Sequence, residues 1–470
     1  MKRAHLIGIG GSGLSAIARL LLESGWSVSG SDRQISPLAE QLQAAGARIT
    51  LGHRPENVAG AELVIRSSAI PDDNVEVRAA REANIPVLKR ADFLGELMAG
   101  KLGIAIAGTH GKTTTTAMIA WVLTALGHDP SFLIGGVSMN LETNARAGQG
   151  DAFVIEADEY DRMFLGLRPE IAVVTNIEHD HPDCFPTPQD FQQAFQDFAN
   201  RLSPDGVLLA CTDDRGAARL LADSAGQGYR TLAYGLERWL GRPGPDYAGR
   251  ELRLNERGGF DFDAFFYDTK LASTALQVPG KHNVRNALAA LAVAHILGLP
   301  PGEAAEALGD FKGTGRRFEL RGEVNGVTVV DDYAHHPTEI RATLAAARTR
   351  YSSRKLWAVW QPHTYSRTRT LFDEFTGAFA DADHVLVTEV FASREANQGN
   401  FSARQVVAAM RHPDVHFVPS LIQAGDFLLE RLQPGDVVLV LSAGDADQVS
   451  ARVLAGLAAP DRQEFIRKAG

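Results

Sequence analysis

Two glycine-rich loops, each placed between a short apolar run and a helix-like segment, constrain the fold of this chain more than any other feature. "HLIGIGGSG" leads into "LSAIARLLLESG", and "LGIAIAGTHGKT" leads into "TTTAMIAWVL". A strand that enters a helix through glycines begins a βαβ unit, in which loop amides and the helix N-terminus face an anion. The pattern therefore predicts an α/β protein with two separate cradles for phosphate groups.

The length and the order of the predicted elements indicate three α/β domains. The 470 residues exceed what one hydrophobic core usually serves. Strand and helix signals alternate within three segments, which predicts parallel sheets covered by helices. We expect a Rossmann-like domain at 1–97, a central P-loop ATPase-type domain at 98–312, and a Rossmann-like C-terminal domain at 313–470. The segment 236–270 has no clear period and is expected to form hairpins inserted in the central domain.

Composition excludes several classes of protein. A net charge of −10 argues against non-specific nucleic-acid binding, because phosphate backbones would be repelled. Cys184 and Cys211 are the only cysteines, so neither a disulfide framework nor a thiolate zinc site is expected. No apolar run approaches the roughly 18 residues of a membrane span. The expectation is a soluble, cytoplasmic protein.

The central loop has the chemistry of a nucleotide phosphate site. Gly108 and Gly111 would expose backbone N–H groups, Lys112 would neutralise the outer phosphates, and Thr113 would offer a hydroxyl to Mg²⁺. The usual P-loop pattern is incomplete, since Ile106 stands where its first glycine belongs. An ordinary strand-to-helix turn is the alternative, but such a turn does not require Lys and Thr directly after Gly.

Carboxylates follow two further predicted strands. "FVIEADEYD" places Glu156, Asp158 and Glu159 at a strand end, and "TNIEHDHPD" places Asp180 and His181 at another. Oxygen ligands at the carboxyl edge of a sheet, opposite a phosphate loop, suit one or two hard cations. Exposed acidic turns are the alternative for either stretch alone.

The first glycine loop indicates a diphosphate without identifying it. Gly8, Gly10 and Gly13 match G-x-G-x-x-G, and Asp32 ends the next strand, where an acid contacts ribose hydroxyls in dinucleotide-binding folds. This pattern alone would favour a nicotinamide-dependent oxidoreductase. An oxidoreductase has no need of the second, lysine-bearing loop, so another diphosphate ligand is equally consistent.

Two polar clusters complete the candidate site. Asn283 and Asn286 lie one turn apart at a predicted helix start, where they could bind a base edge or simply cap the helix. The C-terminal segment groups acidic, imidazole and guanidinium side chains after two apolar runs, which suits a small anionic partner. Solvated histidines are the alternative there. That cluster comprises Asp331, Asp332, Tyr333, His335, His336, His363, Tyr365, Arg367 and Arg369.

A single reaction would use both phosphate loops, the metal ligands and the C-terminal polar cluster. ATP could phosphorylate a carboxylate of the ligand in the first loop, and an amine held by the third domain could then attack the acyl phosphate. Lys112, metal ions and the helix N-terminus would stabilise charge on the transferring phosphoryl group, so no protein nucleophile is required.

In these motifs the chain resembles the Mur ligases, in order and over nearly its whole length. The resemblance rests on "HLIGIGGSGLSAIARLLLESGWSVSGSD", "SSAI", "GTHGKTTTT", "EADE", "TNIEHDH", "GKHNVRNALAA", "GTGRRFE", "DDYAHHPTE" and "QPHTYSRT". It implies a UDP-sugar domain, an ATPase domain and an amino-acid domain. The expected reaction is ATP-dependent joining of L-alanine to the carboxylate of UDP-N-acetylmuramate, with Mg²⁺, in peptidoglycan precursor synthesis.

The resemblance also implies residue roles. Lys112, His181, His335 and His363 would be catalytic, and Thr113, Glu156 and His181 would hold Mg²⁺. The UDP portion would meet Gly8, Gly10, Gly11, Ser12, Gly13, Asp32, Ser67 and Ser68. ATP would meet Gly108, Thr109, His110, Gly111, Lys112, Thr113, Thr114, Asn283, Asn286, Arg316 and Asp332. The amino acid would meet Tyr333, His363 and Arg367.

Two departures from the family pattern leave alternatives open. Thr364 replaces an arginine that the family often carries, which weakens the expected clamp on the amino-acid carboxylate. Tyr160, in "EADEYDRMFL", is closer to the recycling branch that adds a whole tripeptide to UDP-N-acetylmuramate. That recycling activity is the nearest alternative. The alternatives from other classes are the nicotinamide oxidoreductase and a P-loop switch that hydrolyses ATP without an amino acid.

Overall fold

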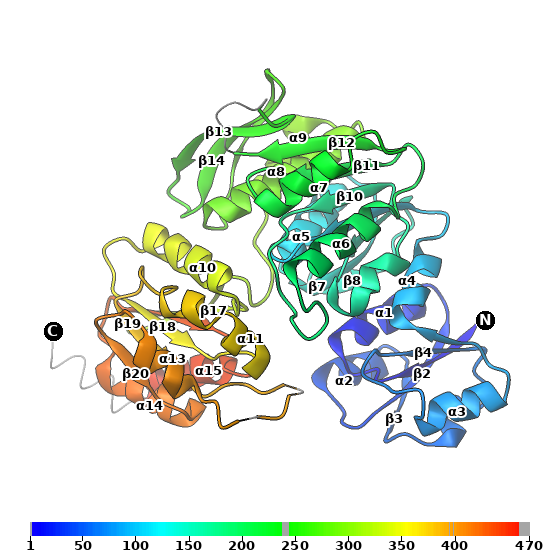
Figure 1. Cartoon of the computed structure of the whole chain (residues 1–470), viewed down its shortest axis with the longest axis horizontal. Coiled ribbons are helices and arrows are strands. Elements are labelled where there is room, and N and C mark those ends of the chain that lie inside the picture. Colours follow the sequence, from blue (N-terminus) through cyan, green and yellow to red (C-terminus); the bar gives the residue numbers. More distant parts are fainter. Residues whose placement is uncertain (1, 237–243, 394, 398, 460–470) are drawn as a thin grey trace.

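Three sheets with helices on their faces make up the chain, seen in a computed structural model that describes residues 2–236, 244–393, 395–397 and 399–459 (Figure 1). The sheets have five, ten and six strands, and parallel pairing dominates each of them. The predicted three-domain α/β class is therefore confirmed. The exact domain limits at 97 and 312 stay a prediction.

The N-terminal sheet is wholly parallel, in the order β3-β2-β1-β4-β5. Its order reverses beside β1, so the first glycine loop lies at the switch point where open α/β sheets bind ligands. Its elements are β1 (Arg3–Ile7), α1 (Ser12–Glu23), β2 (Ser27–Asp32), α2 (Pro37–Ala44), β3 (Arg48–Leu51), η1 (Pro55–Val58), β4 (Leu63–Arg66), α3 (Val75–Glu82), β5 (Val87–Lys89) and α4 (Arg90–Met98).

The central sheet runs in the order β15-β14-β13-β12-β11-β10-β6-β9-β7-β8. Its inner strands are continuous apolar runs because helices cover both faces. The elements are β6 (Leu102–Ala107), α5 (Lys112–Ala125), β7 (Ser131–Ser138), β8 (Thr143–Arg146), β9 (Ala152–Glu156), η2 (Tyr160–Gly166), β10 (Ile171–Val174), α6 (Pro188–Ala199), β11 (Val207–Cys211), α7 (Arg215–Asp223), β12 (Arg230–Gly235), β13 (Tyr247–Leu254), β14 (Phe260–Phe266), β15 (Thr269–Ala275), α8 (Lys281–Ile296) and α9 (Pro301–Gly309).

The hairpins expected within 236–270 are present in the described part of that segment. Strands β13, β14 and β15 pair antiparallel and extend one edge of the central sheet. Residues 237–243 lie outside the described residues. A second antiparallel pair, β7 with β8, was not predicted, because the turn residues inside "IGGVSMNLETNAR" hide its alternation.

The C-terminal sheet has the order β16-β17-β21-β18-β19-β20, with only β16 antiparallel to its neighbour. The apolar runs predicted as strands at its centre are buried along their whole length. The elements are β16 (Glu319–Val324), β17 (Val327–Asp332), α10 (Pro337–Arg350), β18 (Leu356–Trp360), α11 (Tyr365–Thr370), α12 (Phe372–Thr376), β19 (His384–Val387), α13 (Ala403–Ala409), β20 (Val415–Phe417), α14 (Leu421–Arg431), β21 (Val437–Leu441) and α15 (Asp447–Ala458).

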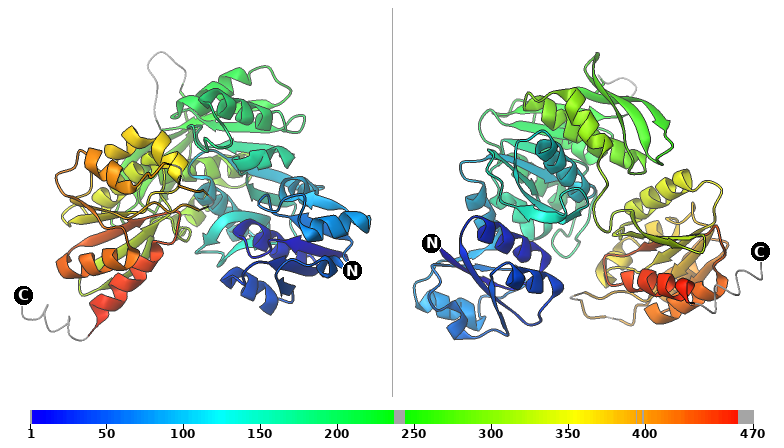
Figure 2. Two further views of the ribbon diagram at one scale, coloured as in Figure 1. Left: turned by 60° about the horizontal axis from the view of Figure 1, so that its bottom comes forward. Right: turned by 180° about the vertical axis from the view of Figure 1, so that it is seen from behind.

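The two interfaces of the central domain differ in chemistry. One hydrophobic cluster continues from α1 and α4 of the N-terminal domain into α6 of the central domain, including Phe93 and Phe164. The C-terminal domain has its own apolar clusters. It contacts the central domain through α10 and α11, and the N-terminal and C-terminal domains lie at different places on the central domain (Figures 1 and 2). Those contacts are mainly ion pairs and hydrogen bonds.

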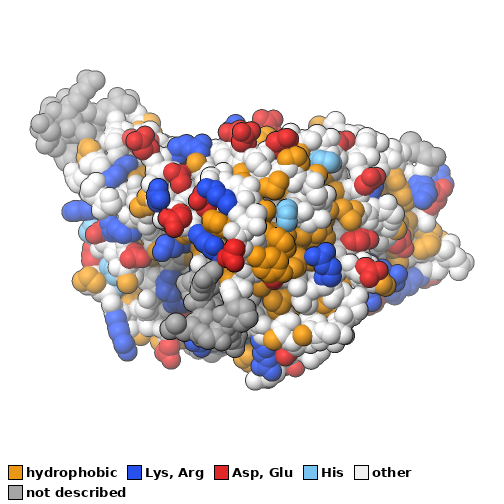
Figure 3. Space-filling model, turned by 90° about the horizontal axis from the view of Figure 1, so that it is seen from above, with side chains coloured by type: hydrophobic (Ala, Val, Ile, Leu, Met, Phe, Trp, Pro, Cys, Tyr) orange, Lys and Arg blue, Asp and Glu red, His pale blue; other side chains and the backbone are white. Residues whose placement is uncertain are grey.

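Charged side chains of both signs lie on the face of the molecule drawn in Figure 3. Figure 3 shows acidic and basic side chains interspersed over the upper face, without a continuous basic area among the side chains described there. Within the described ranges, every helix is too short or too polar to cross a bilayer.

Candidate active site

The central glycine loop is held by the segment that follows β10. Thr175 and Asn176 together bond the backbone of His110, with Asn176 Oδ1 accepting from His110 N at 2.9 Å. The hydroxyl of Thr109 donates to Glu178 O at 2.8 Å and accepts from Glu178 N at 2.9 Å. Gly108 adopts φ 139°, and a Cβ there would lie 2.0 Å from Thr175 Oγ1. The loop conformation therefore depends on glycine and on this second segment.

Lys112 is largely enclosed by carboxylates at the start of α5, with 12% of its side chain exposed. Its Nζ lies 2.8 Å from Glu159 Oε2 and donates to Thr109 O at 3.1 Å. Burial alone would lower the pKa of Lys112, but the nearby carboxylates, Glu159 foremost, outweigh burial and raise it. The lysine is a fixed positive charge beside the loop amides, which suits an incoming polyphosphate.

The predicted metal ligands Thr113 and Glu156 are adjacent. Thr113 Oγ1 donates to Glu156 Oε1 at 3.1 Å, and Gly135 N donates to Glu156 Oε2 at 2.7 Å. Burial raises the pKa of Glu156 despite Lys112 nearby, so its ionised form gains from another cation. The predicted third ligand, His181, has Nε2 3.6 Å from Glu159 Oε1 and 3.8 Å from Asp180 Oδ2. The donor set of hydroxyl and carboxylate fits Mg²⁺.

A cavity of about 350 Å³ opens beside the loop, between the central and C-terminal domains. Seven of the predicted ATP residues line it. Six come from the central domain (His110, Gly111, Thr113, Thr114, Asn283 and Asn286), and Asp332 comes from the C-terminal domain. Burial raises the pKa of Asp332 to about 6, and Arg317 offsets this only in part. The cavity has the size and lining of a small-molecule site.

The asparagine pair lies at the loop end of this cavity. Asn286 Nδ2 donates to Asn283 Oδ1 at 3.1 Å, and Asn283 Nδ2 donates to Pro279 O at 2.7 Å. A Cβ on Gly111 would lie 2.9 Å from Asn286 Oδ1. Part of the hydrogen-bonding capacity is therefore used within the protein, and the contact with adenine stays a prediction.

Arg316 is turned away from the cavity. Its Nη2 donates to Ser442 O at 2.9 Å and to Gly444 O at 3.0 Å, inside the C-terminal domain. Its neighbour Arg317 lines the cavity instead and lies 3.6 Å from Glu339. Both guanidinium groups lie over the ring of Tyr333. The sequence does not distinguish these two consecutive arginines, because the local backbone conformation decides which guanidinium group faces the cavity.

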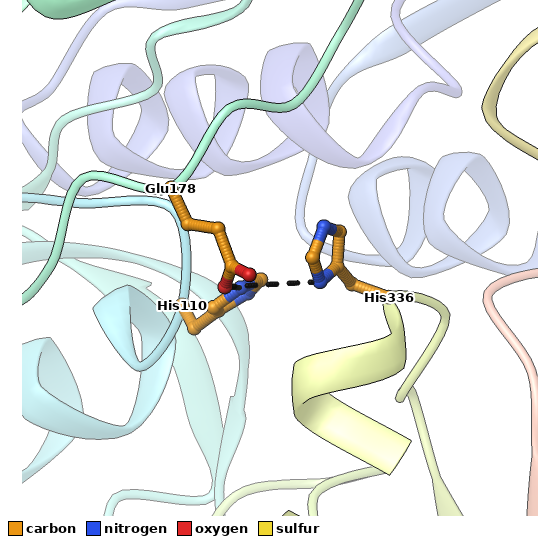
Figure 4. Close-up of side chains that lie close together, drawn as sticks. All are labelled: His110, Glu178 and His336. Carbon is orange, nitrogen blue, oxygen red and sulfur yellow. Dashed lines mark hydrogen bonds and ion pairs between the residues drawn. The ribbon is translucent and has the colours of Figure 1, made fainter. Parts of the chain in front are cut away.

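A polar cluster joins the loop to α10, as Figure 4 shows for its side chains His110, Glu178 and His336. His110 Nε2 lies 3.0 Å from Glu178 Oε2, and His110 Nδ1 lies 3.2 Å from Glu339 Oε1. Thr338 Oγ1 of α10 donates to Glu178 Oε1 at 2.8 Å. Burial would lower the pKa of His110, but Glu339 and Glu178 raise it to about 9.

A buried ion pair joins α11 to the central domain. Arg367 Nε lies 2.8 Å from Asp180 Oδ1, and Arg367 Nη2 lies 3.1 Å from Asp180 Oδ2, a two-pronged contact with both side chains nearly inaccessible. Burial opposes the charge on Asp180, but Arg367 holds its pKa far below the usual range. Arg367, predicted to meet the amino acid, thus also links the two domains.

The predicted histidines of the third domain lie together beside this pair. The rings of His335 and His363 are 5.9 Å apart, and that of Tyr333 is 5.4 Å from His335. Burial lowers the pKa of His335 to about 3 and that of His363 to about 4. Both imidazoles are therefore neutral near pH 7 and act as hydrogen-bond partners.

The first glycine loop is organised by Asp32 and Ser36. Asp32 Oδ2 accepts from Gly10 N at 2.9 Å, and Ser36 Oγ donates to Gly10 O at 2.9 Å. Gly13 packs so closely that a Cβ would lie 2.4 Å from Arg90 Nη1. Gly8 and Gly11 lie in the same turn, while the side chain of Ser12 is outside what the structure describes. Asp32 thus shapes the loop, and its predicted contact with the UDP portion stays untested.

Ser67 and Ser68 follow β4 at the same end of the sheet. Ser67 N donates to Ile7 O at 3.1 Å, and Ser68 Oγ lies 3.8 Å from Met163 Sδ of the central domain. The segment after β4, which lies beside the first loop, therefore contacts the central domain.

Comparison with known protein families decides the family. Three models match successive parts of the chain: "Mur ligase family, catalytic domain" at 3–102, "Mur ligase middle domain" at 106–294, and "Mur ligase, glutamate ligase domain" at 316–444. Together they span most of the sequence. The chain belongs to the Mur ligase family. It is therefore an ATP-dependent ligase.

Individual Mur ligases agree with this assignment. A UDP-N-acetylmuramate–L-alanine ligase of Roseiflexus castenholzii is 43% identical and covers 98% of both chains. One of Geobacter sulfurreducens is 44% identical and covers 97% of this chain and 98% of its own.

Two solved Mur ligase structures also match. A UDP-N-acetylmuramate–alanine ligase of Thermotoga maritima has a TM-score of 0.79 at 27% identity, over 97% of this chain and 99% of the other. A murein peptide ligase of Psychrobacter arcticus has a TM-score of 0.71 at 28% identity, with the same coverage.

Sequence reasoning did not assign a role to Glu178, Glu339 or Arg317 in this Mur ligase. Glu339 stands where a capping box places an acid, and it does accept from His336 N at 3.3 Å. Its contact with His110 of the phosphate loop depends on how the two domains pack, so the sequence pattern does not reveal it. Glu178 lies inside "TNIEHDHPD". Its position between the end of a predicted strand and the predicted site residues Asp180 and His181 is the sequence feature that could have indicated a role.

Thr364, which stands where the family often has arginine, is hydrogen-bonded to a nearby carboxylate. Thr364 Oγ1 donates to Glu395 Oε1 at 2.6 Å, and Ser366 N donates to Glu395 Oε2 at 2.8 Å. In this Mur ligase the position therefore holds a carboxylate of its own chain. Tyr160, the other departure, donates through its hydroxyl to Asp183 Oδ2 at 3.0 Å.

Proposed function

We propose that this Mur ligase joins L-alanine to the carboxylate of UDP-N-acetylmuramate, with ATP as the source of free energy. The relatives at 43–44% identity carry that activity in their names over nearly the same length of chain. One observation carries the proposal: the lysine-bearing phosphate loop opens into a cavity whose other wall is the C-terminal domain. A phosphoryl donor and an amine acceptor can thus meet at one domain boundary.

The first step is phosphoryl transfer to the sugar-linked carboxylate. Lys112, the loop amides from Gly108 to Thr114 and the N-terminus of α5 would stabilise charge on the transferring group. Thr113, Glu156 and His181 would hold Mg²⁺, which when bound neutralises phosphate charge. The product is an acyl phosphate, and ADP leaves from the transferred phosphorus.

The second step is attack by the amine of alanine on the acyl carbon, which forms the amide, breaks the acyl C–O bond and releases phosphate together with the proton that the amine loses. Arg367 would attract the amino-acid carboxylate, and the neutral imidazoles of His335 and His363 would accept hydrogen bonds from the amine. With pKa values of about 3 and 4, these imidazoles orient the amine and do not retain its proton near pH 7. Closure of the C-terminal domain would keep water from the acyl phosphate.

ADP release should require UDP-N-acetylmuramate and an amino acid together. Turnover is followed as ADP formed with each substrate omitted in turn, and amide product is identified by mass spectrometry. Equal ADP formation with neither acceptor nor sugar nucleotide would contradict a ligase and favour a nucleotide-hydrolysing switch.

The second candidate is the recycling ligase that accepts a tripeptide. Tyr160 in "EADEYDRMFL", and the similarity to the murein peptide ligase, favour testing it. L-Ala, L-Ser, Gly and L-Ala-γ-D-Glu-diaminopimelate are compared at equal concentration by phosphate release. Preference for the tripeptide would replace the first proposal, and preference for L-Ala supports it.

A further inference from the structure

We infer that His110, Glu178 and His336 form a binding site for a transition-metal ion of the Zn²⁺ type, separate from the Mg²⁺ ligands. One ligand atom from each residue lies within 4.8 Å of the others. Figure 4 shows the three side chains converging from the phosphate loop, the segment after β10 and the start of α10. The site would therefore bridge the central and C-terminal domains.

The spacing suits four-coordinate zinc. With bonds of 2.0–2.1 Å, ligand atoms around tetrahedral Zn²⁺ lie about 3.3 Å apart. Glu178 Oε2 is 3.0 Å from His110 Nε2 and 3.9 Å from His336 Nδ1. All three ligand atoms lie within 4.8 Å of one another. Movements of up to about 1.5 Å would therefore bring them to the spacing of a tetrahedral Zn²⁺ site.

The donor set selects the class of metal. Two imidazole nitrogens with one carboxylate suit Zn²⁺ or Co²⁺, whereas Mg²⁺ and Ca²⁺ take oxygen ligands. Three protein ligands leave the fourth position for water or a bound ligand. His110 and Glu178 also line the 350 Å³ cavity, so that position is reached from the nucleotide site.

The surrounding hydrogen bonds resemble those that orient zinc ligands. His110 Nδ1 lies 3.2 Å from Glu339 Oε1, which leaves Nε2 to face the metal. Glu178 Oε1 accepts from Thr338 Oγ1 at 2.8 Å, which fixes the carboxylate. His336 is buried, and its Nδ1 accepts a 3.3 Å bond from Thr338 N. Metal binding must displace the proton that His110 carries between its two carboxylates.

The test is Co²⁺ titration of the intact protein, with Mg²⁺ in excess to fill the hard-cation site. We expect one Co²⁺ per chain with the visible absorption of a four-coordinate complex, displaced by Zn²⁺. His336→Gln and Glu178→Gln should each weaken binding more than tenfold. Glu339→Gln should weaken it about 10- to 100-fold by freeing His110.

The matched control is His416→Gln, which alters another histidine beside a carboxylate, Asp414, on the C-terminal domain. It should leave the absorption unchanged. Circular dichroism of every variant identifies any that fail to fold. Absence of Co²⁺ uptake by the intact protein, binding retained in folded His336→Gln, or loss in His416→Gln would each overturn the inference. The readout is spectroscopic, so it stands apart from the ligase assay.

Discussion

Lys112 is the residue on which phosphoryl transfer should depend most. Lys112→Ala removes the charge that lies 2.8 Å from Glu159 at the phosphate loop. We expect ADP formation to fall by at least about 10²-fold, since a fixed donor to the transition state is typically worth that much. UDP-N-acetylmuramate should still bind, as measured by calorimetry.

The control for Lys112 is Lys281→Ala, an exposed lysine at the start of α8. Its ADP formation should be close to that of the parent. Loss of sugar-nucleotide binding together with turnover in Lys112→Ala would show that the two loops do not act separately.

Arg367 is proposed to bind the amino acid, and it also links two domains through Asp180; mutations can separate these two roles. Arg367→Ala leaves Asp180 buried without its cation, a change that typically costs about 3–5 kcal/mol. The KM for the amino acid should rise, and the chain should also be less stable. Arg367→Ala combined with Asp180→Asn should recover stability without recovering the KM. Recovery of both would assign Arg367 to domain packing alone.

Glu76 should make the N-terminal domain sensitive to acid. It is fully buried and accepts hydrogen bonds from Ser31 and Asn57 and from Arg54 N, beside His5. Burial would raise its pKa, but these partners lower it to about 2. A lowered pKa in the folded state adds stability above the unfolded value near 4.5, and this stability is lost as pH falls toward 2.

The matching variant is Glu76→Gln, which keeps the volume and removes the charge. At pH 7 it should unfold at lower urea concentration, with a cost on the order of 1–3 kcal/mol. The difference from the parent should shrink below about pH 4.5. A difference independent of pH would mean that Glu76 contributes by packing alone.

At the scale of elements, the turn from β6 into α5 is the most sensitive. Gly108→Ala would place a Cβ 2.0 Å from Thr175 Oγ1 on a backbone with φ 139°. We expect ATP binding to weaken by tenfold or more because the loop amides would move. Gly302→Ala in α9 is the control, since nothing lies within 4 Å of its added Cβ. Its ATP binding should not change. ATP affinities of the two variants are compared by calorimetry.

At the scale of the whole molecule, the C-terminal domain should move while the other two stay together. The N-terminal and central domains share an apolar cluster, whereas the C-terminal domain is attached through polar contacts such as Glu339 with His110. Glu339→Gln weakens that attachment. It should enlarge the radius of gyration in small-angle scattering, and Glu374→Gln, an exposed acid of α12, should not. Equal radii would argue against a loosely held domain.

The class of fold and the two phosphate loops could be predicted from the sequence, because both depend on local patterns. Buried parallel strands must be continuous apolar runs, and the turns that follow β1 and β6 require glycine. Lys112 and Thr113 could be predicted for the same reason, since they begin the helix after the turn that follows β6, and Glu156 could be predicted because it is the last residue of another apolar strand, β9.

The side-chain contacts between domains could not be predicted in this way, because they depend on how the domains pack. The sequence pattern at Glu339 indicates a helix cap, and the pattern at Asp180 indicates an acidic turn. The sequence does not distinguish Arg316 from Arg317. The folded chain brings Glu339 to His110 and Asp180 to Arg367, and it turns Arg317 toward the cavity. Contacts between residues 187 or 229 positions apart depend on how whole domains pack, and local periodicity carries no information on that distance.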